Sequence, residues 1–216
     1  MTSLKNIKIT HEGSNEKIEA LIVGVFKGSS LNTILKSLSP DNKKATLLAC
    51  KTEAFKGERG EYLSVYGKNS IKRIFLYGLG DLKKLSLDQL RSESAKIFNF
   101  LENKKIPTLS VLSSSFKLSE KGHLQALTEG FFLASYSFSD YKTNSKKSSK
   151  IKTLEFIGNI DKDIAEKSKV LAESVSLSRD LGNHPANILT PTYLANKAKR
   201  ISKNKNMKAK IFDVSD

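Results

Sequence analysis

The sequence of 216 residues contains a single cysteine, Cys50, and no tryptophan. One cysteine cannot form an intrachain disulfide and cannot supply a cluster of thiolate metal ligands. A disulfide-stabilised secreted scaffold and a cysteine zinc site are therefore excluded, and a reducing cytoplasm is the expected compartment. Cys50 closes an apolar run that is predicted to be a strand, so its expected role is that of a small buried side chain.

Long hydrophobic runs are also missing. The first thirty residues are interrupted by charges, so no signal-peptide core is expected there; the charged positions are Lys5, Lys8, Glu12, Glu16 and Lys17. No later run reaches the ~18 residues that a bilayer-spanning helix needs. The sequence predicts neither secretion nor a membrane partner.

Acidic residues are outnumbered by basic ones, and the formal net charge is +15. Such a charge could mark a protein that binds nucleic acid or another anionic surface. The lysines are spread along the chain, however, with local excesses only at 142–152 and 197–210. We interpret them as solvated surface lysines; a nucleic-acid partner stays possible but is not favoured.

Nucleotide-binding and serine-hydrolase motifs are absent. Gly78-Leu79-Gly80 lies between a predicted strand and a predicted helix, but the third glycine of a dinucleotide fingerprint would fall on Lys83. A tight strand-to-helix turn is the expected role of this segment. No phosphate-binding loop and no Gly-x-Ser-x-Gly elbow occurs in the sequence.

Metal ligands at recognisable spacings are absent as well. His11, His123 and His184 stand apart from one another, without a His-Glu-x-x-His pattern. A two-metal hydrolase needs several carboxylates, but 181–212 contains no acidic residue. Acidic residues elsewhere fall mostly in amphipathic helical patterns, where a solvated face is expected. We therefore assign no catalytic, cofactor-binding or metal-binding residue to this chain.

Apolar clusters alternate with helical patterns, which predicts an α/β protein with a mixed, mostly parallel sheet flanked by helices. Helices are expected over 87–101, 124–141, 161–181 and, in a shorter form ended by Pro40, 31–38; Ser86 with Gln89 forms a capping box. Gly182 should end the third long helix, and Thr190 and Pro191 should begin another. Strands are predicted at Ile7–Thr10, Ile18–Phe26, Ala45–Ala49, Tyr62–Tyr66, Arg73–Tyr77, Thr108–Leu112, Thr153–Ile157 and Ala209–Val214.

The polar run at 141–150 indicates a domain boundary, and Gly182 is an alternative. Both fit a division into an N-terminal domain over 1–158, a linking helix over 159–182, and the start of a second domain over 183–216.

Three groups of residues resemble the leucyl (cytosol) aminopeptidase family. The run Arg179-Asp180-Leu181-Gly182-Asn183-His184-Pro185-Ala186-Asn187-Ile188-Leu189-Thr190-Pro191 looks like the opening of its catalytic domain. The stretch 129–142, Glu-Gly-Phe-Phe-Leu-Ala-Ser-Tyr-Ser-Phe-Ser-Asp-Tyr-Lys, is similar to a helix of the family. The segments 55–61 and 76–80 are similar to glycine-marked segments of its N-terminal domain.

The resemblance implies a macro-domain-like N-terminal domain, a linking helix, and the first elements of an α/β metallo-exopeptidase domain. It further implies two divalent ions (Zn, Mn or Mg) in the complete enzyme, peptide substrates and a homo-oligomer, a hexamer in the family. The metal-binding segments Gly-x-Thr-Phe-Asp-Ser-Gly-Gly and Asn-Thr-Asp-Ala-Glu-Gly-Arg do not occur in these residues. The chain is therefore expected to be a truncated form that is inactive alone.

Residues of the 179–191 run that match the family pattern are expected to act as turns and caps; they are Asn183, Pro185, Asn187, Thr190 and Pro191. Apolar residues beyond 182 would lack partners, so this part should be mobile or should associate with another chain. Two other functions stay open. One is a non-catalytic macro-like module that binds nucleic acid or a nucleotide-like ligand, and the other is a scaffold that docks on a full-length relative.

Overall fold

A computed structural model describes residues 3–14, 16–102, 104, 106–141, 150–204 and 207–212. The chain divides into two compact units, Met1–Ser176 and Leu177–Asp216. Of the polar run at 141–150 that was expected to mark a boundary, residues 142–149 lie outside the described residues. Among the described residues, no helix combines the length and the apolarity that crossing a membrane requires.

The first unit is built on one six-stranded sheet with the order β1-β6-β5-β2-β4-β3. All neighbouring strands are parallel except β3 and β4, which are antiparallel. The predicted class, α/β with a mixed, mostly parallel sheet, is confirmed. The strands are β1 (Asn6–Thr10), β2 (Leu21–Phe26), β3 (Tyr62–Tyr66), β4 (Arg73–Gly80), β5 (Thr108–Leu112) and β6 (Thr153–Ile157).

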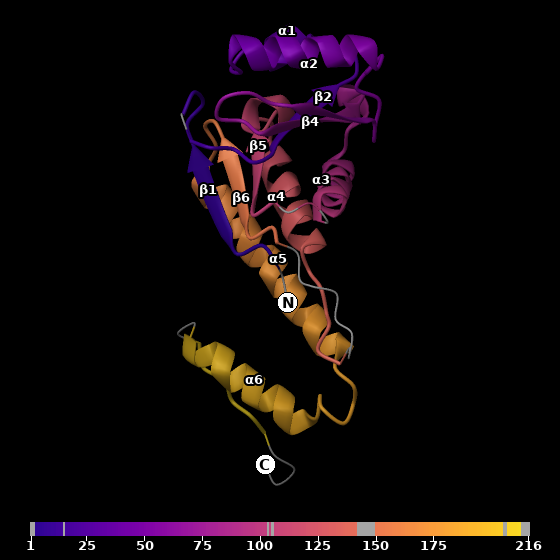
Figure 1. Ribbon diagram of the computed structural model, residues 1–216. Coiled ribbons are helices and arrows are strands. Elements are labelled where there is room, and N and C mark those ends of the chain that lie inside the picture. Colours follow the sequence, from indigo (N-terminus) through magenta and orange to yellow (C-terminus); the bar gives the residue numbers. More distant parts are fainter. Residues whose placement is uncertain are drawn as a thin grey trace. The chain divides into compact units, whose positions relative to one another are not determined.

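Helices cover both faces of this sheet (Figure 1). On one face, α1 (Leu31–Ile34) and α2 (Pro40–Thr52) pack over the β2 and β4 half, and Leu35 and Cys50 are buried against Val23. On the other face lie α3 (Leu87–Glu102), α4 (His123–Ala134) and the first part of α5 (Lys162–Asn183). Two short 3-10 helices, η1 (Leu82–Lys84) and η2 (Ser113–Phe116), follow β4 and β5.

The predicted starts of two helices are confirmed by their hydrogen bonds. Ser86 and Gln89 form the capping box of α3: the Gln89 N–H donates to Ser86 Oγ over 3.2 Å, and the Ser86 N–H donates to Gln89 Oε1 over 3.0 Å. In the second unit, α6 (Pro191–Asn204) begins at the predicted proline, and Thr190 Oγ1 accepts from the Tyr193 N–H over 3.2 Å. Local side-chain chemistry was sufficient for both.

The strand predicted at Ala45–Ala49 is wrong, because this stretch lies inside α2. Pro40 does not end a helix but stands at its first turn, behind the N-cap residue Ser39. Asn42, Thr46 and Cys50 recur every four residues on the buried side, so the apolar run fits a helix as well as a strand. Of the helix predicted over 31–38, only the first four residues, α1, are helical.

The helix predicted over 124–141 ends at Ala134. Ser135 Oγ donates to the Phe132 carbonyl over 2.7 Å, and the Ser135 carbonyl accepts from the Ser3 N–H over 2.9 Å, so the chain leaves the helix to meet the N-terminal segment. The apolar spacing of the sequence continues to Tyr141, but the Ser135 carbonyl is bound by Ser3 rather than by a later N–H of the same helix.

Two further predictions fail near the C-terminus. Gly182 does not end a helix: α5 continues through Asn183, and the His184 N–H still donates to the Asp180 carbonyl over 3.2 Å. The predicted strand Ala209–Val214 has no strand in its described part, 209–212; its last two residues lie outside the described residues. A strand requires a neighbour, which these residues do not have within the described part of the second unit.

Candidate functional site

The three histidines are found in three separate places. His11 lies in the loop after β1; His123 is buried at the start of α4, with Nδ1 3.4 Å from the Phe116 carbonyl oxygen. In the second unit, the His184 ring lies edge-on to Tyr193. Within the described residues, no group of three or more His, Cys, Asp or Glu side chains is placed to hold a metal ion.

Glu155 is a buried carboxylate on β6, between β1 and β5, a position that the sequence did not reveal. Its side chain accepts from Ser110 Oγ (2.5 Å) on β5 and from Thr10 Oγ1 (2.7 Å) on β1, and the Lys8 ammonium lies 3.0 Å away. Burial alone would raise the pKa of Glu155. The two hydroxyls and the ammonium outweigh it, so its pKa lies below the ordinary value of 4.5.

Glu93 and Tyr77 form a second buried polar pair, between α3 and β4. The Tyr77 hydroxyl donates to Glu93 Oε2 over 2.6 Å, and the Lys96 ammonium lies 2.8 Å from the other carboxylate oxygen. Burial, reinforced by the nearby carboxylate, raises the pKa of Tyr77 far above its ordinary value, so the phenol stays protonated and serves as a donor. The pair joins a helix to the sheet.

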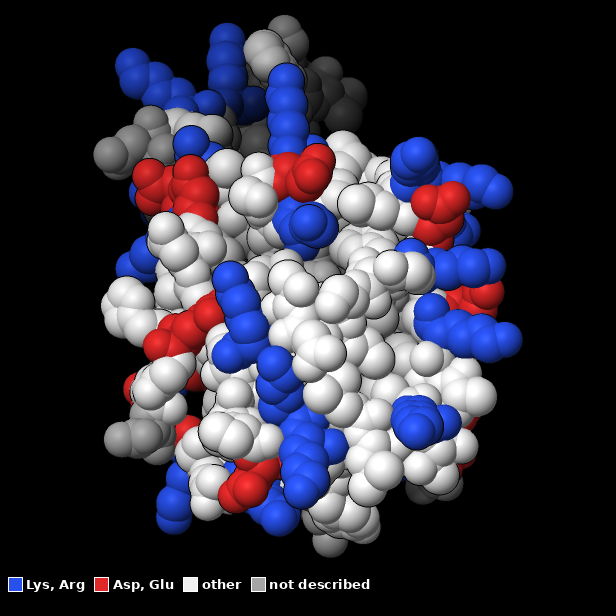
Figure 2. Space-filling model, turned by 90° about the horizontal axis from the view of Figure 1, so that it is seen from above, with Lys and Arg blue, Asp and Glu red and all other residues white. Residues whose placement is uncertain are grey.

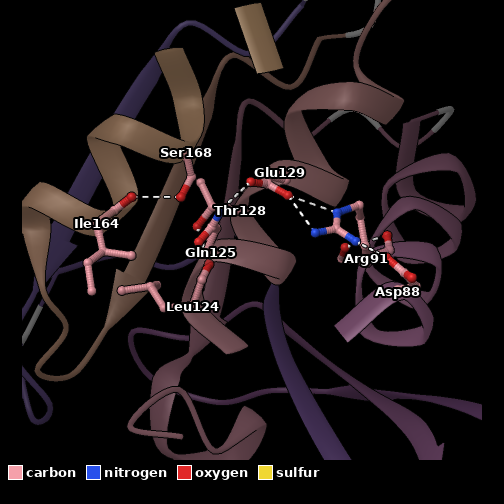
Figure 3. A network of polar contacts seen from close by, with 9 residues as sticks. Asp88, Arg91, Leu124, Gln125, Thr128, Glu129, Ile164 and Ser168 are labelled. Carbon is pink, nitrogen blue, oxygen red and sulfur yellow. Dashed lines mark hydrogen bonds and ion pairs between the residues drawn. The ribbon is translucent and has the colours of Figure 1, made fainter. Parts of the chain in front are cut away.

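Glu129 is the third buried carboxylate and connects α4 to α3 (Figure 3). Arg91 Nε donates to Glu129 Oε2 over 2.8 Å, Arg91 Nη2 lies 2.8 Å from the same oxygen, and the guanidinium also pairs with Asp88. Gln125 Nε2 donates to the other oxygen over 2.7 Å. Because these donors come from two helices, the network fixes α3 against α4.

Gly130, beside Glu129, permits the close approach of the same two helices. A Cβ at this position would overlap the Ser94 hydroxyl and the Arg91 carbonyl oxygen. The Glu-Gly pair that begins the 129–142 stretch therefore has a packing role: Glu129 binds α3, and Gly130 makes room for it.

The two glycine-marked segments lie against each other. The Gly60 N–H donates to the Gly78 carbonyl and the Gly80 N–H to the Gly57 carbonyl, each over 3.0 Å. A Cβ at Gly78 would overlap the Glu58 carbonyl oxygen. The expected strand-to-helix turn at Gly78-Leu79-Gly80 is wrong, since these residues end β4 and contact the 57–61 loop.

The carboxyl end of β2 is occupied by the protein itself. Ligands of parallel α/β sheets commonly bind where neighbouring strands lead to opposite sides, here between β2 and β5. Ser115 in η2 fills this place: its Oγ accepts from the Gly24 N–H over 3.0 Å and donates to the Leu112 carbonyl over 2.6 Å. Phe116 is fully buried, and its ring lies against Gly24, so it fills the same place.

A hollow of about 470 Å³ lies beside the loop after β1. Its described lining includes Glu12 and Glu16 but no lysine or arginine. Glu16 is already paired with Lys8, and Glu12 accepts from Ser114 Oγ over 3.2 Å, so the described lining offers a phosphate neither a lysine nor an arginine. Basic side chains are instead spread over the face shown in Figure 2, with acidic ones between several of them.

Cys50 is buried in α2 rather than at the end of a strand. Burial, with a smaller contribution from Glu61, raises the pKa of its thiol to about 11. The thiol is therefore protonated at neutral pH and unsuited to nucleophilic attack or metal binding.

Comparison with known proteins identifies the family. The N-terminal domain of the cytosol aminopeptidase family matches residues 22–145, more than half of the chain. The chain belongs to the cytosol aminopeptidase family.

Curated relatives match this chain on both sides of residues 22–145. A probable cytosol aminopeptidase of Alkaliphilus oremlandii is 31% identical in an alignment of 210 residues that covers 92% of this chain and 42% of that protein. One of Aquifex aeolicus is 29% identical over 199 residues, 91% of this chain and 40% of that protein. The chain thus spans about two fifths of the length of these relatives.

Solved structures share the fold. A mutant of tomato leucine aminopeptidase has a TM-score of 0.67 at 24% identity and covers 95% of this chain, which in turn covers 44% of it. The bottromycin maturation enzyme BotP in complex with Mn has a TM-score of 0.64 at 16% identity, with 87% of this chain and 37% of that chain covered. At these identities the likeness shows the fold alone.

Proposed function

We propose that this chain supplies the N-terminal part of a two-metal aminopeptidase that removes N-terminal residues from peptides, and that these 216 residues do not cleave peptides alone. The observation that carries the proposal is the match of 22–145 to the family's N-terminal domain, in a chain that spans 42% of a relative named as a cytosol aminopeptidase. Peptide substrates, a homo-oligomer up to a hexamer, and a cytoplasmic location belong to the same proposal.

The described side chains do not fit a pair of divalent ions. A two-metal site needs carboxylates that converge on ions ~3.5 to 4 Å apart. Glu93, Glu129 and Glu155 lie on three different elements, and each is already bound to its own hydroxyl, ammonium or guanidinium partners. We assign no step of the reaction to them. We propose that Zn, Mn or Mg would be held by segments outside these residues. BotP, of which this chain covers 37%, was solved in complex with Mn.

The proposed division is an N-terminal macro-like domain over 1–158, a linking helix over 159–182, and the start of the catalytic domain over 183–216. The two compact units, with their division after Ser176, support a separate second part. The ion pair between Arg91 on α3 and Glu129 on α4, and the hydrogen bonds between the 57–61 loop and the end of β4, support a structural role for the first part.

A direct test is to assay the purified chain on leucine amide with added Mn²⁺ or Zn²⁺. We expect no turnover above a protein-free control, because the described carboxylates are engaged in structural pairs. The Alkaliphilus oremlandii relative, assayed in parallel, controls for substrate and metal. Metal-dependent turnover by the 216-residue chain would contradict the proposal.

The alternative function is a non-catalytic module for nucleic acid or a nucleotide-like ligand, supported by the +15 charge alone. Phosphate contacts would make such binding weaken steeply with salt. Binding of a labelled oligonucleotide that persists at physiological salt and falls at higher salt would favour this alternative. The scaffold alternative predicts co-purification with a longer relative.

A further inference from the structure

The strand β3 forms one edge of the sheet and has a single neighbour, β4. Its pairing with β4 is regular from Tyr62 to Tyr66, without a bulge. At the ends of the ladder, the Gly78 N–H donates to the Glu61 carbonyl over 2.7 Å and the Gly67 N–H donates to the Lys72 carbonyl over 3.0 Å. Residues 61 and 67 of this strand segment therefore face β4.

Backbone groups of an antiparallel strand face its neighbour at every second residue. Since 61 and 67 face β4, the N–H and C=O groups of Tyr62, Ser64 and Tyr66 point away from the sheet. These three residues present a row of donors and acceptors that a further strand can bind.

The two edges of the sheet differ in charge. β1, at the other edge, carries Lys8 and follows Lys5, and lysine is a common means of preventing edge-to-edge association. The sequence of β3, Tyr-Leu-Ser-Val-Tyr, contains no charged residue, no proline and no glycine. Nothing in β3 itself opposes the addition of another strand.

Two aromatic side chains stand exposed along β3. Tyr62 is 59% exposed and Tyr66 is 78% exposed, although both rings are held in place. The Tyr62 ring lies 4.5 Å from that of Phe100, and the Arg73 guanidinium lies 4.8 Å over the Tyr66 ring. Rings that are exposed and already ordered lose little conformational freedom when a partner covers them.

We infer that β3 pairs with β3 of a second copy of this chain, antiparallel and centred on Ser64, so that the two sheets join into one. In this register Tyr62 lies opposite Tyr66 of the second copy, and Leu63 lies opposite Val65. Ser64 lies opposite Ser64. Aromatic and β-branched residues are the favoured cross-strand partners, and the contact is the same on both copies, as a twofold interface requires.

The self-complementary, uncharged sequence of β3 favours a second copy as the occupant. The net charge of +15 opposes association in general, but the paired strands bring no like charges together. At each end of the pair, Glu61 of one copy lies opposite Gly67 of the other, and its carboxylate stays bound to the Lys56 and Glu58 N–H groups. The pairing involves only the first unit and does not depend on peptidase activity.

The test uses sedimentation velocity of the full chain over a range of concentrations. Wild type should dimerise. Ser64→Lys places two lysines opposite each other and should raise the dissociation constant by at least roughly tenfold, because like charges across an interface repel. Ser64→Glu should have the same effect. An equal mixture of the two variants should dimerise again, since Lys then faces Glu.

Two controls separate this effect from misfolding and from net charge. Ser64→Thr keeps an uncharged strand former and should keep the dimer, while Thr33→Lys adds the same charge on the exposed side of α1 and should leave association unchanged. Circular dichroism of each variant checks folding. A monomeric wild type, a dimer insensitive to Ser64→Lys, or a mixture of the charged variants that stays monomeric would each overturn the inference.

Discussion

Glu155 illustrates how a carboxylate is kept charged inside a sheet. Its pKa lies below 4.5 because Ser110, Thr10 and Lys8 stabilise the charged form more than burial destabilises it. A group with a lowered folded-state pKa adds stability above its unfolded pKa, and this stability is lost as the pH falls through the folded value. The contribution of Glu155 should thus be full above about pH 4.5 and absent in stronger acid.

Replacing Glu155 tests this directly. Glu155→Gln keeps the shape but removes the charge that Lys8 and the two hydroxyls bind, so we expect the free energy of unfolding at pH 7 to fall by about 1 to 3 kcal/mol. The loss should shrink as the pH falls through the lowered pKa of Glu155, where wild type becomes protonated too. Urea unfolding at pH 7 and at the lowest pH where the fold persists measures it.

Glu173, exposed on α5, provides the control: Glu173→Gln should change the unfolding free energy by less than ~0.5 kcal/mol at either pH. An equal loss for Glu155→Gln at both pH values would mean that shape, and not charge, accounts for the role of Glu155.

At the scale of elements, the contact between α3 and α4 depends on Gly130. Gly130→Ala places a methyl group against the Ser94 hydroxyl and the Arg91 carbonyl, so the helices must separate. We expect a loss of about 1 to 3 kcal/mol in unfolding free energy, as for other overpacked sites. Thermal and urea unfolding measure it.

Gly182 is the matched control, since it lies in α5 with open space around it. Gly182→Ala should not destabilise the chain and should favour the helix locally by roughly 0.5 to 1 kcal/mol. If both substitutions have the same effect, close packing at Gly130 is not the cause.

The starts of α3 and α6 were predictable because their capping partners are three residues away. Ser86 with Gln89 and Thr190 with Pro191 lie where local chemistry places them. The end of α4 was not predictable: this helix stops where the Ser3 N–H donates to the Ser135 carbonyl, and no local pattern contains Ser3. The resemblance found the Glu-Gly pair, but its contacts with Arg91 and Ser94 needed the structure.

At the scale of the whole chain, the two compact units suggest unequal resistance to protease. We expect trypsin to cut first at exposed basic residues of α6, such as Lys199 and Arg200, because the described part of this helix is without a buried residue. The first unit has a large buried core and should persist. Mass spectrometry of early fragments locates the cuts.

A core fragment ending at Arg179 or within α6, at Lys197, Lys199 or Arg200, would agree with the proposed start of the last part at 183. Early cuts within α3, at Arg91 or Lys96, or equal resistance of the two units, would contradict that division.

The sequence by itself determined the alternation of strands and helices, the class of the fold and the family, because these depend on apolar periodicity and on short runs of residues. Only the tertiary structure decided which carboxylates are buried, where the glycines let backbones touch, and which edge strand is left open. Burial and close approach depend on residues distant in sequence: Glu155 meets Thr10 and Ser110, and Gly78 meets Glu58, only after the chain has folded.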